Sequence, residues 1–218
     1  MPICFDNKHI FIHIPKTGGS SIISRLNMPK KIHSFSGSGM QITFKGLLCA
    51  EDHIPAFLFK EIRPDIFGRF YKFSFVRNPY DRVISEFLWI FRDEWITQTY
   101  SLTDQEMKDK FDVWLFSYYI DRENSRKCTQ KWFLYCKDKR KLLIDQIYKF
   151  EEFESEFDKL TKKLNIVPEN MKILKKAKIE VDRNILLTEK NKQYIYSVFK
   201  EDFETFKYPK EYVWNKKI

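Results

Sequence analysis

The sequence of 218 residues has little of what marks a disulfide-stabilised, metal-binding or membrane-spanning protein. It contains four cysteines, and no two of them form a CxxC pair. Zinc sites and redox motifs usually need such close spacing, so we expect four reduced, mostly buried thiols and no metal site. No apolar run approaches the roughly 20 residues that a membrane-spanning helix needs, and the first residues lack the architecture of a signal peptide. We therefore expect a cytoplasmic protein without a transmembrane segment, although a fragment of a membrane-anchored enzyme would share these features.

Glycine and proline are also scarce, at 6 and 8 residues, and no linker, repeat or low-complexity tract divides the chain. The length suits one domain, which we predict to span residues 1–218. Lysine and arginine exceed aspartate and glutamate by 39 to 30, which gives a net charge of +9. Such a charge suits a nucleotide, a nucleic acid, a sulfated or uronic polysaccharide, or a membrane surface, and does not choose among them.

Strand patterns alternate with helix patterns along the chain. Apolar runs at residues 9–14, 69–76 and 141–150 predict three strands, whereas residues 27–50 predict an irregular loop. Helices are predicted at residues 20–26, 55–62, 80–91, 153–164 and 191–206, and over much of 92–141. This alternation is typical of an α/β fold with a central, mainly parallel sheet flanked by helices.

A glycine loop follows the first predicted strand and looks like a nucleotide phosphate loop with its parts reordered. The Walker A pattern places glycine first and Lys-Ser/Thr last, whereas here lysine and threonine precede two glycines and two serines. The glycines let the backbone wrap closely around an anion, and the N-terminus of the next helix presents unpaired N–H groups. With a lysine charge and hydroxyl donors added, the loop suits a phosphate or sulfate ester. Its candidate residues are Lys16, Thr17, Gly18, Gly19, Ser20 and Ser21.

A second candidate anion site lies where the second predicted strand ends, in "VRNPYDRVIS". Arg77 lies at the strand end, and Ser85 lies in the following helix. A guanidinium can bind a phosphate with two parallel hydrogen bonds, and a serine hydroxyl can donate to the same group. Arg82 is a further candidate, with a helix-surface ion pair as its other interpretation. Because the carboxyl ends of parallel strands meet at one edge of a sheet, the two motifs could face one ligand.

The pairing of "IPKTGGSS" with "FSFVRNPYDRVIS" resembles the sulfotransferases that use 3′-phosphoadenosine 5′-phosphosulfate (PAPS). The likeness is greatest to the carbohydrate branch, with its heparan and chondroitin enzymes and bacterial homologues. It extends over most of the chain, through "DHIPA", "IDQIYKFEEF" and "VFKEDFETFKY". The resemblance implies a P-loop-like three-layer fold, a 5′-phosphosulfate loop at residues 16–21, and a 3′-phosphate motif at Arg77 and Ser85. It also implies 3′,5′-ADP as a product.

Two departures from this family pattern concern the later part of the chain. Lys149 stands where relatives often have arginine, and a lysine supplies charge but no planar fork. Residues 172–187 match the cofactor-covering loop of relatives poorly, and only Lys175 and Lys176 are suspected contacts there.

Sulfuryl transfer requires charge stabilisation at the leaving oxygen and a base for the acceptor hydroxyl. Lys16 is the candidate for the first role, and dense positive charge around it predicts no metal requirement. Among the four histidines, His9 and His13 suit packing, and His33 lies in the irregular loop. His53 matches a family histidine and is our predicted base. Other possible bases are Glu51, Asp52 and Glu86.

Three other functions compete with this interpretation. A P-loop kinase would need Mg-ATP, but no GxxxxGK[ST] motif and no clear metal-binding aspartate follows a strand. A basic nucleic-acid-binding module would bind with steep salt dependence, but no known motif is visible and no nucleic acid is expected as a partner. A degenerate fold used only for binding would not need the lysine, arginine and serine of both motifs.

The acceptor is left open by the sequence. The resemblance implies a sugar hydroxyl, and a small molecule or protein tyrosine remains an alternative. Basic residues that could hold an anionic acceptor are Lys30, Lys31, Lys45, Arg92 and Arg122.

Overall fold

The computed structural model describes residues 1–28, 41–44, 47–92, 102–118, 128–167 and 181–212. The chain divides into two compact units. The first comprises Met1–Arg77 and Arg122–Leu174, and the second comprises Asn78–Asp121 and Lys175–Ile218. The single domain over residues 1–218 stays a prediction beside this division.

A four-stranded sheet forms the centre of the first unit, in the order β1-β2-β5-β6. Strand β2 (His9–Phe11) pairs in parallel with β5 (Tyr71–Val76), and β5 pairs in parallel with β6 (Gln146–Lys149). Only β1 (Ile3–Cys4) runs antiparallel, beside β2. The predicted α/β fold with a mainly parallel sheet is confirmed.

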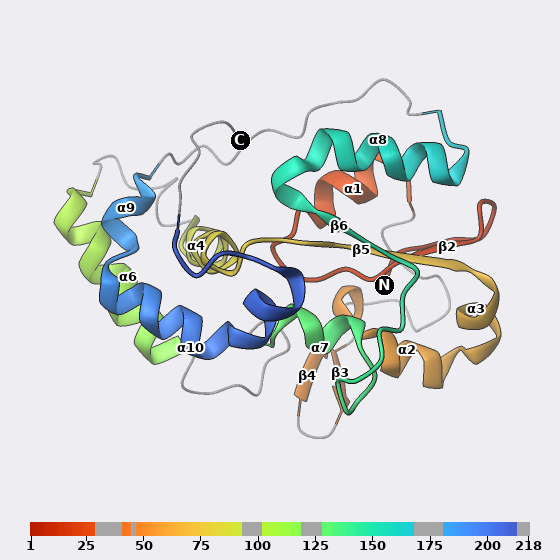
Figure 1. Cartoon of the computed structure of the whole chain (residues 1–218), viewed down its shortest axis with the longest axis horizontal. Helices are drawn as coiled ribbons and strands as arrows, with labels where there is room; N and C mark the ends of the chain where they lie inside the picture. The colour runs from red at the N-terminus through yellow and green to blue at the C-terminus, as the bar shows by residue number, and fades with distance from the viewer. Residues whose placement is uncertain (29–40, 45–46, 93–101, 119–127, 168–180, 213–218) are drawn as a thin grey trace. The chain divides into compact units, whose positions relative to one another are not determined.

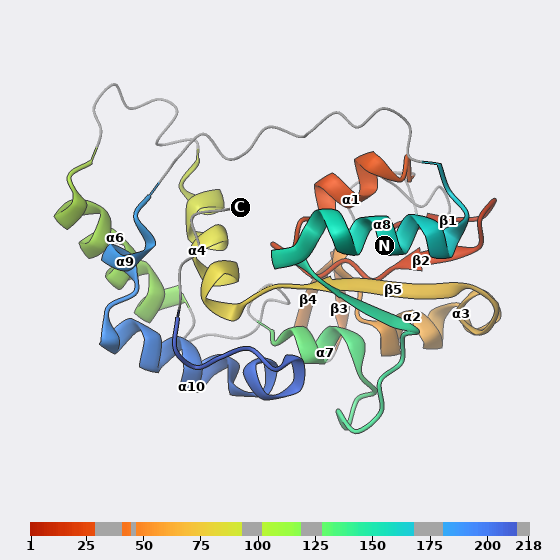
Figure 2. The ribbon, with the colours of Figure 1, turned by 45° about the horizontal axis from the view of Figure 1, so that its top comes forward.

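Helices cover both faces of this sheet, which gives the unit three layers (Figures 1 and 2). One face carries α1 (Gly19–Arg25) and α8 (Phe153–Leu164). The other carries α2 (Ala56–Ile62), α3 (Pro64–Arg69) and α7 (Gln130–Leu134).

The core under α1 and α8 is largely aromatic. Alternate residues of the strands, Phe11, Phe73 and Phe75, point to this face, where Phe157 and Leu160 of α8 meet them. Arg25 closes its edge, because its guanidinium lies 4.5 Å from the centre of the Phe157 ring and donates to both carboxylate oxygens of Glu154. The predicted spacing of the α8 core face is confirmed, and this packing fixes α1 behind the glycine loop.

Four predictions about local structure need correction. The first strand ends at Phe11 rather than at Ile14. Within the predicted loop, strands β3 (Gln41–Phe44) and β4 (Leu47–Ala50) form an antiparallel hairpin. Two β-favouring runs separated by two residues, one of them glycine, are a hairpin signal that the composition around them obscured. The second strand begins at Tyr71 rather than 69, because α3 extends to Arg69. The third strand covers only Gln146–Lys149, since residues 141–145 precede the parallel pairing with β5.

The second unit is helical in its described part. It contains α4 (Pro79–Ile90), α6 (Asp104–Tyr118), α9 (Arg183–Leu186) and α10 (Glu189–Phe206). Tyr80 of α4 meets Phe203 of α10 edge to face, with ring centres 4.9 Å apart. As predicted, Ile195, Phe199 and Phe206 are buried on the inner face of the last helix. These contacts are those expected of amphipathic helices packed on one another.

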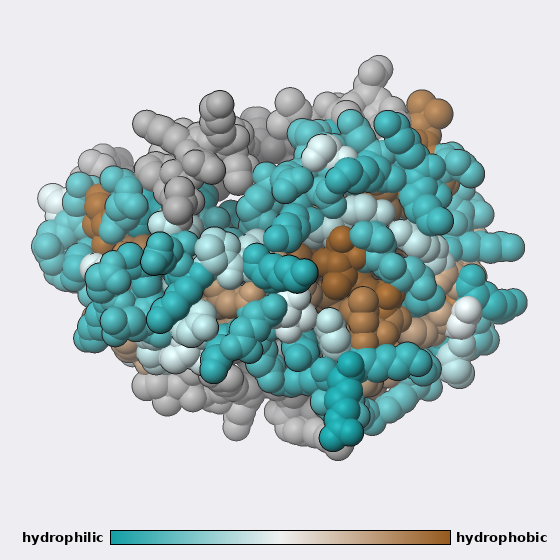
Figure 3. All heavy atoms as spheres, viewed as in Figure 1, coloured by the Kyte–Doolittle hydropathy of each residue, from teal (hydrophilic) through white to brown (hydrophobic). Residues whose placement is uncertain are grey.

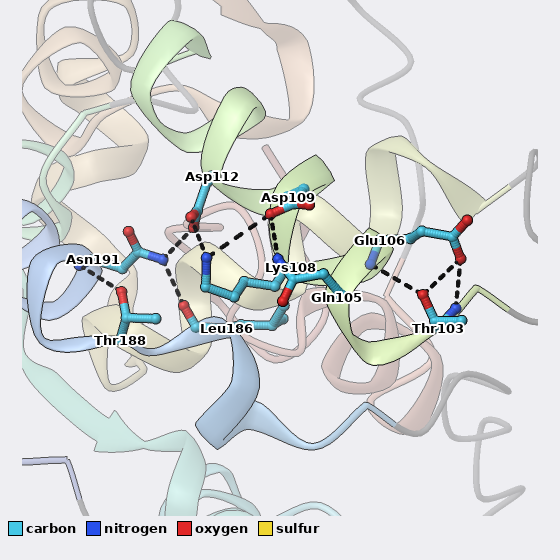
Figure 4. A network of polar contacts seen from close by, with 9 residues as sticks. All are labelled: Thr103, Gln105, Glu106, Lys108, Asp109, Asp112, Leu186, Thr188 and Asn191. Atoms are coloured by element: carbon cyan, nitrogen blue, oxygen red, sulfur yellow. Dashed lines mark hydrogen bonds and ion pairs between the residues drawn. The ribbon is translucent and has the colours of Figure 1, made fainter.

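A polar network joins α6 to the start of α10 (Figure 4). The Asn191 amide donates to the Asp112 carboxylate at 2.6 Å and to the Leu186 carbonyl at 2.8 Å. Lys108 pairs with the same Asp112 across one helical turn. Elsewhere in this unit, the Asp81 carboxylate pairs with Arg183 and accepts from the Tyr212 hydroxyl at 2.8 Å. Both networks join residues far apart in sequence and so hold the two parts of this unit together.

The surface in the view of Figure 1 is largely hydrophilic, with an apolar patch near β6 (Figure 3). Within the described residues, no helix has the length and apolar character that crossing a membrane requires. Cys4, Cys128 and Cys136 are free thiols, as predicted, but they are half-buried rather than buried.

Candidate active site

The glycine loop lies between the carboxyl end of β2 and the start of α1. A hydrogen bond within the loop closes its turn, because the buried Thr17 hydroxyl donates to the Ile14 carbonyl at 3.0 Å. Since a threonine hydroxyl has one proton to donate, this bond commits it to the loop. Lys16 has a φ of 66° and Gly18 a φ of 83°. A lysine in this left-handed region costs about 1 kcal/mol, and the loop therefore holds Lys16 in a mildly strained backbone conformation.

The two glycines are required because other side chains pack against them. A Cβ atom at Gly18 would lie 2.4 Å from the Phe150 ring, and its positive φ also disfavours any other residue. A Cβ atom at Gly19 would lie 1.8 Å from Nε2 of His13. The sequence analysis predicted glycines for the approach of an anion, and the structure adds that two rings occupy their other side.

Helix α1 begins without a side-chain cap. Its N-cap residue is Gly18, which offers no side-chain acceptor to the first turn. Ser20 is exposed and Ser21 half-buried in that turn. The first N–H groups of a helix have no acceptor within the helix, so this end is suited to an anion.

Arg77 directly follows β5 and reaches the glycine loop. Its guanidinium donates to the Lys16 carbonyl at 3.2 Å and lies 4.6 Å from the centre of the Phe150 ring. Its backbone N–H donates to the Gln130 side-chain oxygen at 2.8 Å, and its carbonyl accepts from the Gln130 amide at 2.7 Å. The structure therefore brings together the cationic residues of both predicted motifs, Lys16 and Arg77.

His53 lies in the same unit, between β4 and α2, and is half-buried. Its Nδ1 lies 2.9 Å from the His13 carbonyl oxygen. Because a carbonyl only accepts, Nδ1 must carry the proton, and Nε2 of the neutral ring then holds the basic lone pair. The His13 ring lies beside it, with ring centres 4.3 Å apart. Burial, then the neighbouring charges of His53, the N-terminus and Lys16, hold the pKa of His13 well below its ordinary value.

A scan against protein-family models matches residues 2–209 to a model described as "Sulfotransferase family". The chain belongs to the sulfotransferase family. It is therefore classed among the PAPS-dependent transferases. Comparison with curated proteins and with solved structures gives no match.

In this sulfotransferase, Ser85 and Arg82 belong to the second unit. Ser85 is half-buried in α4, and Arg82 is buried with its guanidinium 5.5 Å from the centre of the Phe199 ring. Arg77 is the last residue of the first unit. The pairing of Arg77 with Ser85 at one phosphate stays a prediction.

The remaining sequence candidates are divided between described and undescribed parts of the sulfotransferase. Asp52 is exposed, Glu86 is buried in α4, and Lys149 is half-buried at the end of β6. Arg92 is exposed and donates to the Trp89 carbonyl. Within the described ranges, no three His, Cys, Asp or Glu side chains gather as metal ligands would. The candidate residues from the sequence analysis that lie outside the described part of the structure are Lys30, Lys31, His33, Lys45, Arg122, Lys175, Lys176 and the side chain of Glu51.

Three residues of this site had not been predicted to take part. Phe150 contacts both Gly18 and Arg77, Gln130 binds the Arg77 backbone, and the His13 carbonyl orients His53. His13 adjoins the glycine loop in sequence, which was a usable signal. Neither Gln130 nor Phe150 lies in an anion-binding pattern, so only the fold reveals their role.

Proposed function

We propose that the protein transfers a sulfuryl group from PAPS to a hydroxyl group of a carbohydrate acceptor. One observation carries the proposal. The Arg77 guanidinium donates to the backbone carbonyl of Lys16, so the arginine of the proposed 3′-phosphate motif contacts the backbone of the proposed 5′-phosphosulfate loop. A nucleotide with anionic groups at both its 5′ and 3′ positions needs donors from two such motifs close to one another.

The residues of the first unit fit this donor. The uncapped start of α1 and the two glycines would hold the 5′-phosphosulfate, together with the side chains of Lys16, Ser20 and Ser21. Thr17 would contribute its backbone N–H, since its hydroxyl proton is used within the loop. Arg77 would bind the 3′-phosphate, and Ser85 is its proposed partner there. PAPS supplies an activated sulfuryl group whose leaving group is 3′,5′-ADP.

The residues of the chain then have two tasks, to stabilise negative charge on the leaving group and to accept the proton of the acceptor hydroxyl. The Lys16 ammonium stabilises the negative charge that develops on the leaving phosphate oxygen. His53 accepts the proton of the acceptor hydroxyl at Nε2, while the His13 carbonyl holds its ring through Nδ1. Dense positive charge at the loop is suited to this transfer without a metal ion.

The carbohydrate acceptor rests on the family likeness and on charge. The motif pair resembles the carbohydrate branch, and the net charge of +9 is compatible with an anionic sugar polymer as well as with the anionic donor. Transfer of labelled sulfate from PAPS to heparosan or desulfated chondroitin, but not to a tyrosine peptide, is the expected result. Transfer to the peptide alone would contradict the carbohydrate assignment.

The experiment that tests the donor is a thermal-shift titration with 3′,5′-ADP, 5′-ADP and Mg-ATP. A ligand at 100 times its Kd stabilises the native state by about 2.7 kcal/mol. We expect 3′,5′-ADP to raise the melting temperature more than 5′-ADP does. In Arg77→Ala the two nucleotides should raise it equally. Arg69→Ala is the matched control, because this arginine is exposed at the end of α3. Stabilisation by Mg-ATP alone would indicate a kinase instead.

A further inference from the structure

Gln130 is a fully buried polar residue whose side chain binds one other residue at two points. It is the first residue of α7, and none of its surface is exposed. Its amide oxygen accepts from the Arg77 N–H, and its amide nitrogen donates to the Arg77 carbonyl. The chemistry of Arg77 fixes this orientation, because an N–H needs an acceptor and a carbonyl needs a donor.

This contact takes over where the sheet pairing ends. The last β5 residue paired with β6 is Val76, opposite Lys149, so Arg77 lies one residue beyond the ladder. Buried backbone groups need hydrogen-bond partners, and a primary amide can act as a strand partner by offering both a donor and an acceptor. Gln130 thereby continues the backbone hydrogen bonding of β5 by one residue, to Arg77.

The fixed backbone determines where the Arg77 side chain goes. From that position the guanidinium lies on the Phe150 ring and donates to the Lys16 carbonyl. Phe150 also packs against Gly18, so the same ring supports both anion motifs. Contacts at its backbone and on the face of its guanidinium restrict the orientation of the Arg77 side chain, and an oriented planar guanidinium can bind a phosphate with two parallel hydrogen bonds.

We propose that Gln130 is a positioning residue that sets the preference of this sulfotransferase for a 3′-phosphate. The inference rests on the proposed function, since it assigns the 3′-phosphate to Arg77. The new element is that the preference for a 3′-phosphate depends on a buried amide in α7. We propose that this amide contacts the Arg77 backbone and does not contact the nucleotide.

The test is the ratio of two dissociation constants, that of 5′-ADP over that of 3′,5′-ADP, measured by calorimetry for the full chain. Gln130→Met keeps the approximate volume and removes both hydrogen bonds, so we expect the ratio to fall about tenfold. Gln130→Glu keeps an acceptor for the Arg77 N–H and removes the donor to its carbonyl, and it should lower the ratio by a smaller factor. If the methionine variant does not fold, the ratio of dissociation constants is measured for Gln130→Glu instead.

Thr129→Ala is the matched control. Thr129 caps α7 by accepting from the Trp132 N–H and has no recorded contact with Arg77 among the described residues. Its loss should lower the melting temperature and leave the ratio unchanged, which separates a weakened helix from a misplaced arginine.

The outcomes distinguish the two proposals. If the wild type binds 5′-ADP and 3′,5′-ADP equally, the proposed function fails and the inference fails with it. If the wild type prefers 3′,5′-ADP and the folded Gln130 variants keep the full preference, the inference alone is overturned. A ratio that falls equally in Thr129→Ala also overturns it, because general destabilisation then accounts for the change.

Discussion

Two of the parallel strands, β2 and β5, lead into their helices in opposite ways. After β2 the chain takes seven residues to reach α1, passes through left-handed conformations at Lys16 and Gly18, and starts the helix without a side-chain cap. After β5 only Arg77 and Asn78 intervene, and the Asn78 side chain accepts from the Tyr80 N–H at 3.0 Å.

The difference suggests two ways of preparing the anion sites that we propose. The first junction has left-handed backbone conformations and leaves the start of its helix uncapped, so its backbone N–H groups are the proposed binding surface. At the second junction the backbone groups have partners: Asn78 caps α4, Pro79 lies in the first turn, and Gln130 binds the Arg77 backbone. The proposed anion contact there is therefore made by the Arg77 side chain. Substitutions should therefore affect the first junction through its backbone and the second through its side chains.

The largest effect is expected for Gly19→Ala. The new methyl group would lie 1.8 Å from His13 Nε2, and the His13 ring is held between Phe11 and His53 and has little room to move. We expect unfolding free energy to fall by about 3 kcal/mol and 3′,5′-ADP to bind more than about 100-fold more weakly, roughly 2.7 kcal/mol. Urea denaturation and calorimetry measure the two.

Gly68→Ala is its control. Gly68 lies in α3, and nothing lies within 4 Å of an added Cβ atom. Since alanine favours a helix over glycine by up to about 1 kcal/mol, this variant should be neutral or slightly stabilised. Equal damage at both glycines would contradict the packing argument at Gly19.

Lys16 combines a left-handed backbone with the charge that we propose for catalysis, and two variants separate the two properties. Lys16→Met keeps a side chain at φ 66°, whereas Lys16→Gly removes the strain. Both should lower kcat by about 100-fold or more, since both lose the ammonium. The free energy of unfolding of Lys16→Gly should exceed that of Lys16→Met by about 1 kcal/mol, because glycine adopts this backbone conformation without strain. Equal stability would show that Lys16 adopts its backbone without strain.

A pH titration should distinguish strand β2 from strand β5, because β2 begins with a buried histidine and β5 contains none. Burial lowers the pKa of His9 from 6.5 to about 4. Between these values the unfolded chain binds a proton that the native chain does not, so stability falls as pH falls from 6.5 towards 4. The contribution is at most about 1.4 kcal/mol for each pH unit.

His9→Gln should therefore reduce the loss of unfolding free energy between pH 7 and pH 5 by up to about 2 kcal/mol. Urea denaturation at the two pH values gives the difference. His13, whose pKa is lowered in the same direction, accounts for part of the remaining loss. An identical pH dependence in wild type and variant would show that His9 already titrates normally in the native protein.

The smallest effect is expected for Asn78→Ala at the second junction. Loss of the cap should lower unfolding free energy by about 1 kcal/mol, with the Kd of 3′,5′-ADP nearly unchanged, because the cap lies on the backbone of α4 and not on a binding side chain. Urea denaturation with calorimetry checks both values. A large loss of nucleotide affinity would show that the two junctions do not differ as described.

Much of the fold could be predicted because it follows from local patterns. Strands β2, β5 and β6 and helices α1, α4, α8 and α10 were predicted from periodicity and from the positions of glycine and proline, whereas β1 was not predicted. The β3–β4 hairpin was missed because its runs are short and lie in a polar surrounding. The length of β6 was overestimated because only pairing with β5, and not composition, decides where it begins.

The sequence by itself determined the α/β fold class and the two motifs, Lys16 to Ser21 and Arg77, because chain order places both directly after apolar strands. The tertiary structure alone decided which distant residues support them. Gln130 and Phe150 meet Arg77 across 53 and 73 positions of sequence, and His13 meets His53 across 40. Such pairs depend on how helices and loops pack around the sheet, and neither residue propensity nor spacing along the chain encodes that packing.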